Sequence, residues 1–155
     1  MEQGNETSRN GKLRIILLED NDNLRTVMTM LLTRKGYEVF SFSKPTVCPL
    51  QAQPACRCGR NQACTDVILT DLDMPEIDGI RFIEILKKKK CKCCHVAVMS
   101  GNLKADDIYH AVRLGCSAFE KPLDMDALFQ WLDGIEKKIP SSRELCDWFC
   151  ESLET

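Results

Sequence analysis

The sequence predicts an α/β protein built on a doubly wound, five-stranded parallel sheet with helices on both faces. Two observations lead to this prediction. Short apolar runs that suit strands alternate with longer stretches in which apolar residues recur at helical spacing. The run at residues 67–69 is continuously apolar, which is typical of a strand buried on both faces of a parallel sheet. A chain of 155 residues is long enough for one such domain with one core.

Five runs rich in β-forming residues are the expected strands. They lie at residues 13–18, 37–42, 67–69, 95–99 and 117–120. Because strand and helix alternate along the chain, we expect the strands to pair in parallel, with their carboxyl ends at one edge of the sheet.

Apolar residues at helical spacing predict the helices. Asn21 is a good cap for the first one, and Gly36 ends it. Its apolar face consists of Leu24, Val27, Met28, Leu31 and Leu32. The faces after the third, fourth and fifth strands consist of Ile80, Ile83 and Leu86, of Ile108, Ala111 and Val112, and of Leu128, Leu132, Ile135 and Ile139.

Two stretches depart from this alternation. Pro45, Pro49 and Pro54 make a long regular helix unfavourable after the second strand. Residues 141–144 form a capping-box pattern, which predicts a short C-terminal helix. The apolar face of that helix would consist of Leu145, Trp148, Phe149 and Leu153.

These patterns divide the chain into three parts. We expect a flexible N-terminal tail at residues 1–11 and a single domain at residues 12–139. That domain carries a Pro/Cys-rich insert at about residues 44–64, and a helical extension follows at residues 140–155.

The composition restricts the classes of function. The formal net charge is -2 and the sequence pI is about 5.7, which disfavours direct binding to DNA. The start of the chain lacks the apolar core of a signal peptide, and no apolar stretch approaches the ~18 residues that a membrane helix needs. We therefore expect a cytoplasmic protein that contacts neither membrane nor DNA.

Polar side chains that suit phosphate chemistry follow the expected strands. They are Glu19, Asp20, Asp71, Asp73, Ser100 and Lys121. In a parallel sheet the carboxyl ends of the strands share one edge, where such folds hold their ligands. Converging carboxylates repel one another unless a cation intervenes, and Mg²⁺ suits carboxylate and phosphate oxygens. An aspartate at this edge can act as a nucleophile that forms an aspartyl phosphate, with Lys121 and Ser100 binding phosphoryl oxygens.

The same residues resemble the receiver domain of two-component response regulators. The resemblance covers about residues 12–138 and includes an acidic pair after the first strand and Asp-x-x-Met-Pro followed by Asp-Gly after the third. Ser follows the fourth strand and Lys-Pro the fifth. The resemblance implies a flavodoxin-like sheet of strand order 2-1-3-4-5. It also implies phosphorelay signalling, with a sensor histidine kinase or a phosphotransfer protein as phosphoryl donor.

The resemblance also implies roles for individual residues. Asp71 would accept the phosphoryl group. Mg²⁺ would be bound by Asp20, by Asp71, by the backbone carbonyl of Asp73 and, through water, by Glu19. Ser100 would be the switch hydroxyl, and the bond from Lys121 to Pro122 would be cis.

The expected function is that of a stand-alone module, because the ~15 residues after the last core helix cannot form an output domain. The resemblance implies that it is not an enzyme, apart from intrinsic autodephosphorylation. Phosphorylation would switch a surface that an unknown downstream protein binds.

Two features depart from the family pattern: the Pro/Cys-rich stretch that replaces the usual second helix, and the aromatic switch position. The aromatic switch residue usually stands three residues before the lysine, where this chain has Ala118. Phe119 is one residue closer to the lysine and could take the role through a shifted register.

The ten cysteines include two clusters, which precede the third and fourth strands. They consist of Cys56, Cys58 and Cys64 and of Cys91, Cys93 and Cys94. The expected strand order makes these strands neighbours, so the clusters could meet at the amino edge of the sheet. Three interpretations stay open: reduced thiols that only pack, a zinc site, or a disulfide or iron-sulfur cluster. For Cys116, Cys146 and Cys150 burial is the preferred interpretation.

Two other functions are compatible with parts of the sequence. Asp71 and Asp73 also resemble the nucleophile and acid of haloacid-dehalogenase-like phosphatases, although those enzymes place their metal-binding acids after the lysine. Turnover of a phosphate monoester would support that alternative. A cysteine-based metal or redox sensor on a receiver scaffold is the other, and bound zinc or iron would support it.

Overall fold

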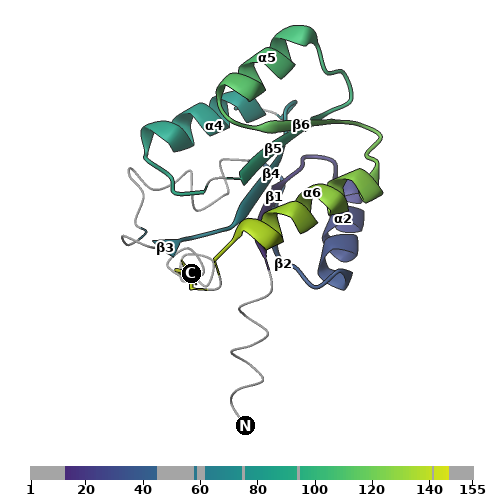
Figure 1. Ribbon diagram of the computed structural model, residues 1–155. Coiled ribbons are helices and arrows are strands. Elements are labelled where there is room, and N and C mark those ends of the chain that lie inside the picture. The colour runs from purple at the N-terminus through teal and green to yellow at the C-terminus, as the bar shows by residue number, and fades with distance from the viewer. Residues whose placement is uncertain are drawn as a thin grey trace.

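The computed structural model describes residues 13–44, 58, 62–74, 76–93, 95–140 and 142–146. Within them a five-stranded parallel sheet has the strand order β2-β1-β4-β5-β6 (Figure 1). The strands are β1 (Arg14–Leu18), β2 (Glu38–Phe42), β4 (Val67–Asp71), β5 (His95–Ser100) and β6 (Ser117–Glu120). Counted along the chain, these five strands have the predicted order 2-1-3-4-5, so the predicted fold class is confirmed.

Four helices connect or follow these strands in the described part of the chain. They are α2 (Asp22–Arg34), α4 (Gly79–Lys88), α5 (Ala105–Arg113) and α6 (Met125–Lys138). Side-chain caps start three of them: Asn21 accepts from Leu24 N at 2.9 Å, and Asp78 and Asp124 cap α4 and α6 in the same way. Among the described residues, no helix combines the length and apolar character that spanning a bilayer requires.

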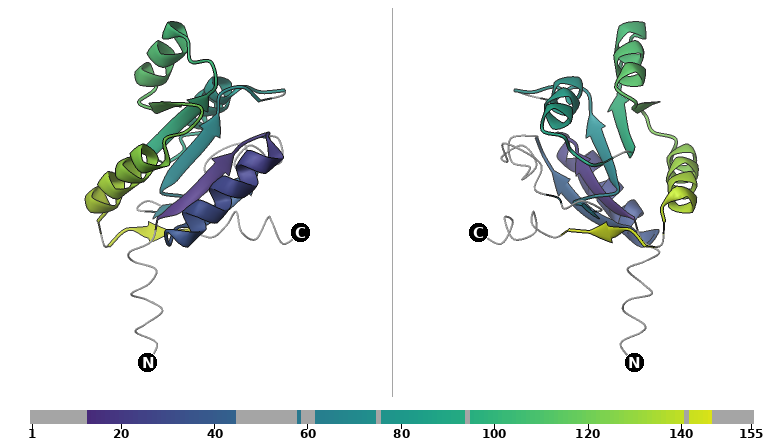
Figure 2. Two further views of the ribbon diagram at one scale, coloured as in Figure 1. Left: turned by 90° about the vertical axis from the view of Figure 1, so that its right-hand side faces the viewer. Right: turned by 60° about the vertical axis from the view of Figure 1, so that its left-hand side comes forward.

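The helices form two layers, one on each face of the sheet (Figure 2). Alternate residues of β1 point to opposite faces: Ile15 and Leu17 pack with the buried residues of α2 and α6, whereas Ile16 and Leu18 pack with α4. All five residues of β1 and of β4 are buried. This double burial explains why residues 15–18 and 67–69 form continuous apolar runs.

A second, small sheet lies beyond the amino edge of the main one. It pairs β3 (Gln62–Ala63) in parallel with β7 (Glu144–Leu145), and β7 is the short yellow arrow in Figure 2. The sequence predicted neither strand. Where the capping-box pattern predicted the start of a C-terminal helix, the structure has β7, so that start was wrong.

Tertiary contacts explain this difference. The guanidinium of Arg143 donates to both carboxylate oxygens of Asp66 at 2.8 Å, and Cys146 N donates to Ala63 O at 3.0 Å. These bonds hold residues 143–146 extended along β3, and a local capping pattern cannot compete with them.

Several other predictions fall outside the described residues. They concern the tail at residues 1–11, most of the insert (residues 45–57 and 59–61) and the remainder of the C-terminal extension (residues 147–155).

Candidate functional site

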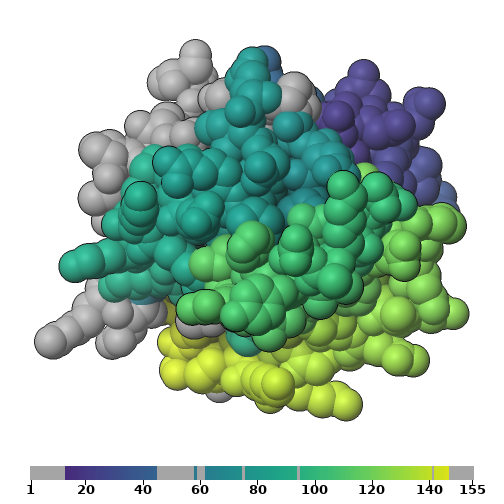
Figure 3. All heavy atoms as spheres, turned by 90° about the horizontal axis from the view of Figure 1, so that it is seen from above, coloured from purple at the N-terminus to yellow at the C-terminus, as the bar shows by residue number. Residues whose placement is uncertain are grey.

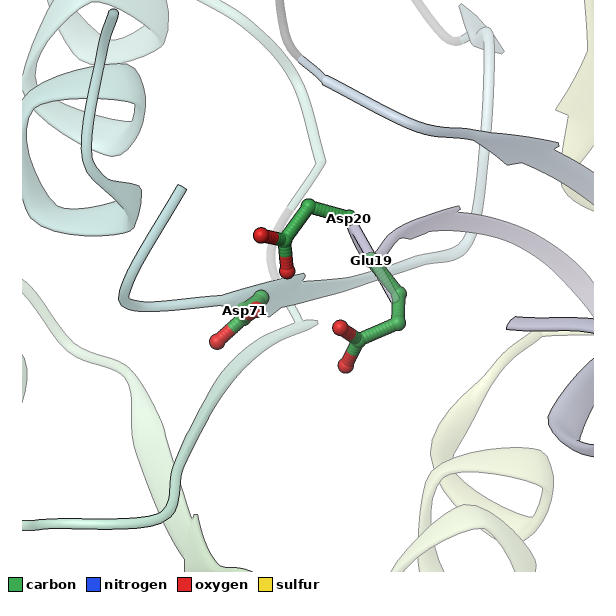
Figure 4. A group of neighbouring side chains, drawn as sticks. All are labelled: Glu19, Asp20 and Asp71. Carbon is green, nitrogen blue, oxygen red and sulfur yellow. The ribbon is translucent and has the colours of Figure 1, made fainter. Parts of the chain in front are cut away.

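Three carboxylates converge at the carboxyl edge of the sheet. Glu19 and Asp20 follow β1, and Asp71 is the last residue of β4. One carboxylate oxygen of each lies within 4.8 Å of the others, and Figure 4 shows the three side chains gathered around one space. We call these three residues the acidic site. The sequence predicted this convergence, because the carboxyl ends of parallel strands share one edge of a sheet. In the structure, β1 and β4 are parallel neighbours.

Glu19 is fully buried, and its carboxylate forms an ion pair with Lys121. Its Oε1 lies 2.6 Å from the Lys121 ammonium, and its Oε2 accepts from Asn21 N at 3.0 Å. Asp20 is exposed. Of the acidic pair after β1, Asp20 is therefore the side chain that can ligate a cation from the solvent side.

Lys121 contacts residues at the carboxyl ends of three strands, β1, β4 and β5. Its Nζ lies 2.6 Å from Glu19 and 3.4 Å from Asp71 Oδ1. Its backbone N donates to Ser100 O at 2.8 Å, which holds the residue after β6 beside the end of β5. The Lys121–Pro122 peptide bond is cis, as predicted.

Ser100 and Asp73 form a bridge to Asp71. The buried Ser100 hydroxyl donates to Asp73 Oδ2 at 2.9 Å and accepts from Asn102 N. Asp73 N in turn donates to Asp71 Oδ1 at 3.2 Å. The side chain of Asp73 thus holds Ser100, while its backbone N–H holds Asp71.

Gly79 packs closely against the backbone of Asp71 and Leu72. A Cβ at this position would lie 2.5 Å from Asp71 O and 3.0 Å from Leu72 Cα. The Asp-Gly pair that starts α4 therefore has two roles, because Asp78 caps the helix and Gly79 lets the helix approach the backbone of Asp71. The sequence showed the pair but not this close approach.

The surroundings of Asp71 raise its pKa to about 7. Burial is the main cause, followed by the hydrogen bond with Asp20 and the charge of Glu19, while Lys121 acts in the opposite direction. Burial also opposes ionisation of Asp20, but its hydrogen bonds to Asp71 and Glu19 outweigh burial and lower its pKa. Without a cation, Asp71 thus holds a proton up to near-neutral pH. This donor set fits a hard divalent cation that replaces the proton.

Phe119 does not join the acidic site. Its ring packs edge-on against Trp131 of α6, with the ring centroids 5.7 Å apart. Ala118 points to the opposite face, where it packs near the buried Ala111 of α5. The packing therefore gives no support to Phe119 as the switch aromatic.

Four of the predicted cysteine ligands lie together at the amino edge of the sheet. Cys58, Cys64, Cys91 and Cys93 belong to one core cluster, whereas Cys56 and Cys94 lie outside the described residues. Cys146 joins the same cluster, although the sequence favoured plain burial for it. Only the pairing of β3 with β7 brings it there, and no local pattern could indicate that. Cys116 is buried away from this cluster, as predicted.

Comparison with known proteins agrees with this geometry. A family model described as "Response regulator receiver domain" matches residues 15–133. The regulatory protein AtoC of Escherichia coli is 28% identical over 118 residues, which are 74% of this chain and 23% of that protein. The two-component response regulator-like PRR73 of Oryza sativa is 30% identical over 132 residues, which are 84% of this chain and 16% of that protein.

Solved structures show the same fold. The Francisella response regulator 1452 receiver domain superposes with a TM-score of 0.68 at 17% identity and covers 82% of this chain and 98% of that one. The chemotaxis response regulator CheY4 of Vibrio cholerae gives a TM-score of 0.66 at 19% identity, covering 80% and 98%. The chain spans only 23% of AtoC and 16% of PRR73, so the match concerns one domain of each. With the family model matched over residues 15–133, the chain belongs to the response regulator receiver domain family.

Proposed function

We propose that this chain is a phosphoryl-accepting switch in which Asp71 takes a phosphoryl group from a phosphohistidine in a Mg²⁺-dependent reaction. The observation that supports this most is the set of three carboxylates within 4.8 Å, with the Lys121 ammonium 3.4 Å from Asp71. A sensor histidine kinase or a phosphotransfer protein is the proposed donor, in keeping with the family.

The chemistry requires an ionised Asp71. A carboxylate oxygen of Asp71 forms a bond to phosphorus while the bond from phosphorus to the donor's imidazole nitrogen breaks, and the electron pair of that bond returns to the nitrogen. Lys121 stays beside Asp71 and balances the charge of the phosphoryl oxygens. Glu19 holds the Lys121 ammonium in place at 2.6 Å.

The acidic site fits the predicted metal. Asp20 and Asp71 would bind Mg²⁺ through carboxylate oxygens, with the backbone carbonyl of Asp73 as a further ligand and Glu19 acting through water. When bound, the ion would neutralise negative charge on the transferring group. Asp20 offers its carboxylate from the solvent side, where a hydrated ion can approach.

The bond between Ser100 and Asp73 is the proposed switch. A phosphoryl group on Asp71 offers oxygens that compete with Asp73 for the Ser100 hydroxyl. Movement of Ser100 would alter the surface of α5, β6 and α6, which an unknown downstream protein would bind. On α5 the side chains of Ile108, Tyr109 and Val112 are exposed, and α5 is coloured green in the view from above (Figure 3).

The contacts of Asp73 do not favour the phosphatase alternative. A general acid must keep its carboxyl free to protonate the leaving group, but Asp73 accepts from Ser100 and its backbone binds Asp71. We therefore propose a module that is not an enzyme apart from slow loss of its own phosphoryl group.

Labelling of the full chain with acetyl phosphate tests the function. With Mg²⁺ we expect one phosphoryl group per chain on Asp71, a strong reduction of labelling in a chelator, and release of the label over time. Asp71→Asn should abolish labelling, whereas Asp73→Asn is the matched control that leaves the acceptor in place. Label on Asp71→Asn protein, or steady turnover of a phosphate monoester, would contradict the proposal.

A further inference from the structure

Five cysteines from three separate stretches meet at the edge of the sheet opposite the acidic site. We call them the thiol cluster: Cys58, Cys64, Cys91, Cys93 and Cys146. Cys64 precedes β4, and Cys91 and Cys93 precede β5, so they lie at the amino ends of the strands that carry Asp71 and Ser100 at their other ends. In Figure 1, β3 marks this edge at the lower end of the sheet.

Four of these thiols form two close pairs. Cys146 Sγ donates to Cys58 Sγ at 3.1 Å, and these two residues are 88 positions apart in the chain. The side chains of Cys64 and Cys91 interact, and this interaction raises the pKa of the Cys64 thiol and lowers that of the Cys91 thiol. Cys93 differs, because its Sγ donates to the backbone carbonyls of Asp66 and His95. Because its thiol already donates to two backbone carbonyls, we choose the other four cysteines for the proposed ligand set.

Buried polar bonds hold the two pairs next to each other. The Arg14 guanidinium, which is buried, donates to Cys64 O at 3.1 Å and to Cys146 O at 2.9 Å. The ion pair between Asp66 and Arg143 fixes the stretch that leads to Cys146. A buried guanidinium is costly to desolvate, and here its bonds position the backbone of two cysteines.

We propose that Cys58, Cys64, Cys91 and Cys146 form a four-thiolate zinc site. Four thiolates are a common tetrahedral ligand set for structural Zn²⁺. Binding would convert four S–H groups into four zinc-sulfur bonds and release four protons, with no change of oxidation state. Lys87 acts electrostatically on Cys91, and Arg14, which also pairs with Glu38 at 2.6 Å, donates to the backbone carbonyls of two of the cysteines.

Zinc binding would bring the four thiols closer together than they stand in this structure. Among the described residues, the acidic site is the group whose ligand atoms all lie within 4.8 Å of one another. The four sulfur atoms instead stand as two pairs, and zinc binding would draw these pairs together. The site would then tie Cys58, within the Pro/Cys-rich insert, to both the sheet and the C-terminal stretch.

Plain packing is a weaker explanation for these four thiols. Cys116 shows what packing alone looks like: it is buried against apolar neighbours, and the hydrogen bond of its Sγ goes to a nearby carbonyl, Leu114 O. Cys58 and Cys146 are instead only partly buried and face each other. A hydrophobic role alone would not select sulfur at both positions.

Zinc analysis of the full chain tests this inference. The protein is purified with a reducing agent and without chelator, and zinc is measured by plasma mass spectrometry. We expect about one zinc per chain, a reactive-thiol count that rises by about four when a chelator removes the metal, and thiolate-to-metal absorption after substitution by Co²⁺. Cys58→Ser and Cys146→Ser should each lose most of the zinc, and Cys116→Ser, the matched control, should retain it.

Several outcomes would overturn the site. They are reduced protein without metal after incubation with Zn²⁺, iron in place of zinc, or zinc retained by Cys146→Ser protein. Zinc that depends on Cys56 but not on Cys58 would overturn this ligand set. A Cys58–Cys146 disulfide in metal-free protein would identify a redox pair instead. Because the two substituted thiols are only partly buried, circular dichroism can verify that the variants fold. Asp71→Asn should leave zinc unchanged, so this test is independent of the phosphorylation proposal.

Discussion

The two edges of the sheet present opposite chemistry. At the carboxyl edge, hard oxygen ligands come from Glu19, Asp20 and Asp71. Burial and the neighbouring carboxylates raise the pKa of Asp71 to about 7. At the amino edge, the thiol cluster gathers soft sulfur ligands among apolar side chains. Mg²⁺ prefers the first kind of ligand and Zn²⁺ accepts the second, so the two proposed sites would take chemically different ions.

The comparison also shows how each site is built. The acidic site follows directly from parallel pairing, because each acid stands at the end of a strand. The thiol cluster depends on Arg14, Asp66 and Arg143, which bring the C-terminal stretch back to the sheet. Substitutions that act on one edge and spare the other can therefore test whether the two sites are independent of each other.

Lys121→Met should have the largest effect, and only at the carboxyl edge. It leaves the fully buried Glu19 without its ion-pair partner, which we expect to lower the free energy of unfolding by about 3 kcal/mol. Labelling of Asp71 should fall by about 100-fold, because the charge near the transferring group is lost. Lys44→Met is the control, since its 3.5 Å pair with Glu76 is exposed and contributes about 0.5 kcal/mol at most. Equal urea midpoints for the two variants would contradict this account.

Arg14→Met should act at the amino edge. The carbonyls of Cys64 and Cys146 lose a buried donor, and we expect a loss of about 2 kcal/mol in urea unfolding. Asp71 labelling should stay within about twofold of the parent protein, and zinc content should fall. Arg113→Met, on the exposed side of α5, should change neither stability nor zinc. A labelling defect as large as that of Lys121→Met would show that the two edges are coupled.

Gly79→Ala should displace α4 relative to the backbone of Asp71. The new Cβ would collide with Asp71 O, so the start of α4 must move, which we expect to destabilise the protein by about 2 kcal/mol. Labelling should slow by about tenfold, because a shift of the nucleophile spoils its alignment. Gly134→Ala is the matched control: it lies in α6 with nothing within 4 Å and should stabilise by about 0.5 kcal/mol. Unaltered labelling kinetics in Gly79→Ala would remove the proposed role of this close approach.

Asp71→Asn should have the smallest effect on stability, and with the opposite sign. The folded protein raises the pKa of Asp71 from 3.8 to about 7, so the folded state binds the proton more tightly than the unfolded state. Stability of the metal-free protein should therefore fall as the pH rises from about 4 to about 7. Asp71→Asn should weaken this fall and stabilise the metal-free protein at neutral pH by about 1 kcal/mol. Thermal unfolding at pH 5 and pH 8 in chelator measures both, and a parallel pH dependence in the two proteins would contradict the crowding.

Saturating Mg²⁺ should reproduce part of this stabilisation in the parent protein by mass action. It should have little effect on Asp71→Asn, which lacks one carboxylate ligand. A similar rise in melting temperature for both proteins would place the ion elsewhere.

The predictions from sequence failed where local patterns lost to distant contacts. The capping-box pattern at residues 141–144 indicated a helix, but Arg143 binds Asp66 and Glu144 pairs with Gln62 in the small sheet. The switch role of Phe119 stays a prediction, although the two-residue period of β6 directs its ring to Trp131.

The sequence by itself determined the parallel α/β fold class and the acidic site, whereas the strand order was predicted from the resemblance to receiver domains. The fold class and the site follow from short-range rules: continuous apolar runs form doubly buried strands, and the residue after such a strand lies at the ligand-binding edge. Only the tertiary structure decided that Cys146 faces Cys58, that Ser100 binds Asp73, and that Gly79 approaches Asp71. These contacts join segments that are distant in sequence or depend on ångström-scale approach, and no pattern within one segment encodes either.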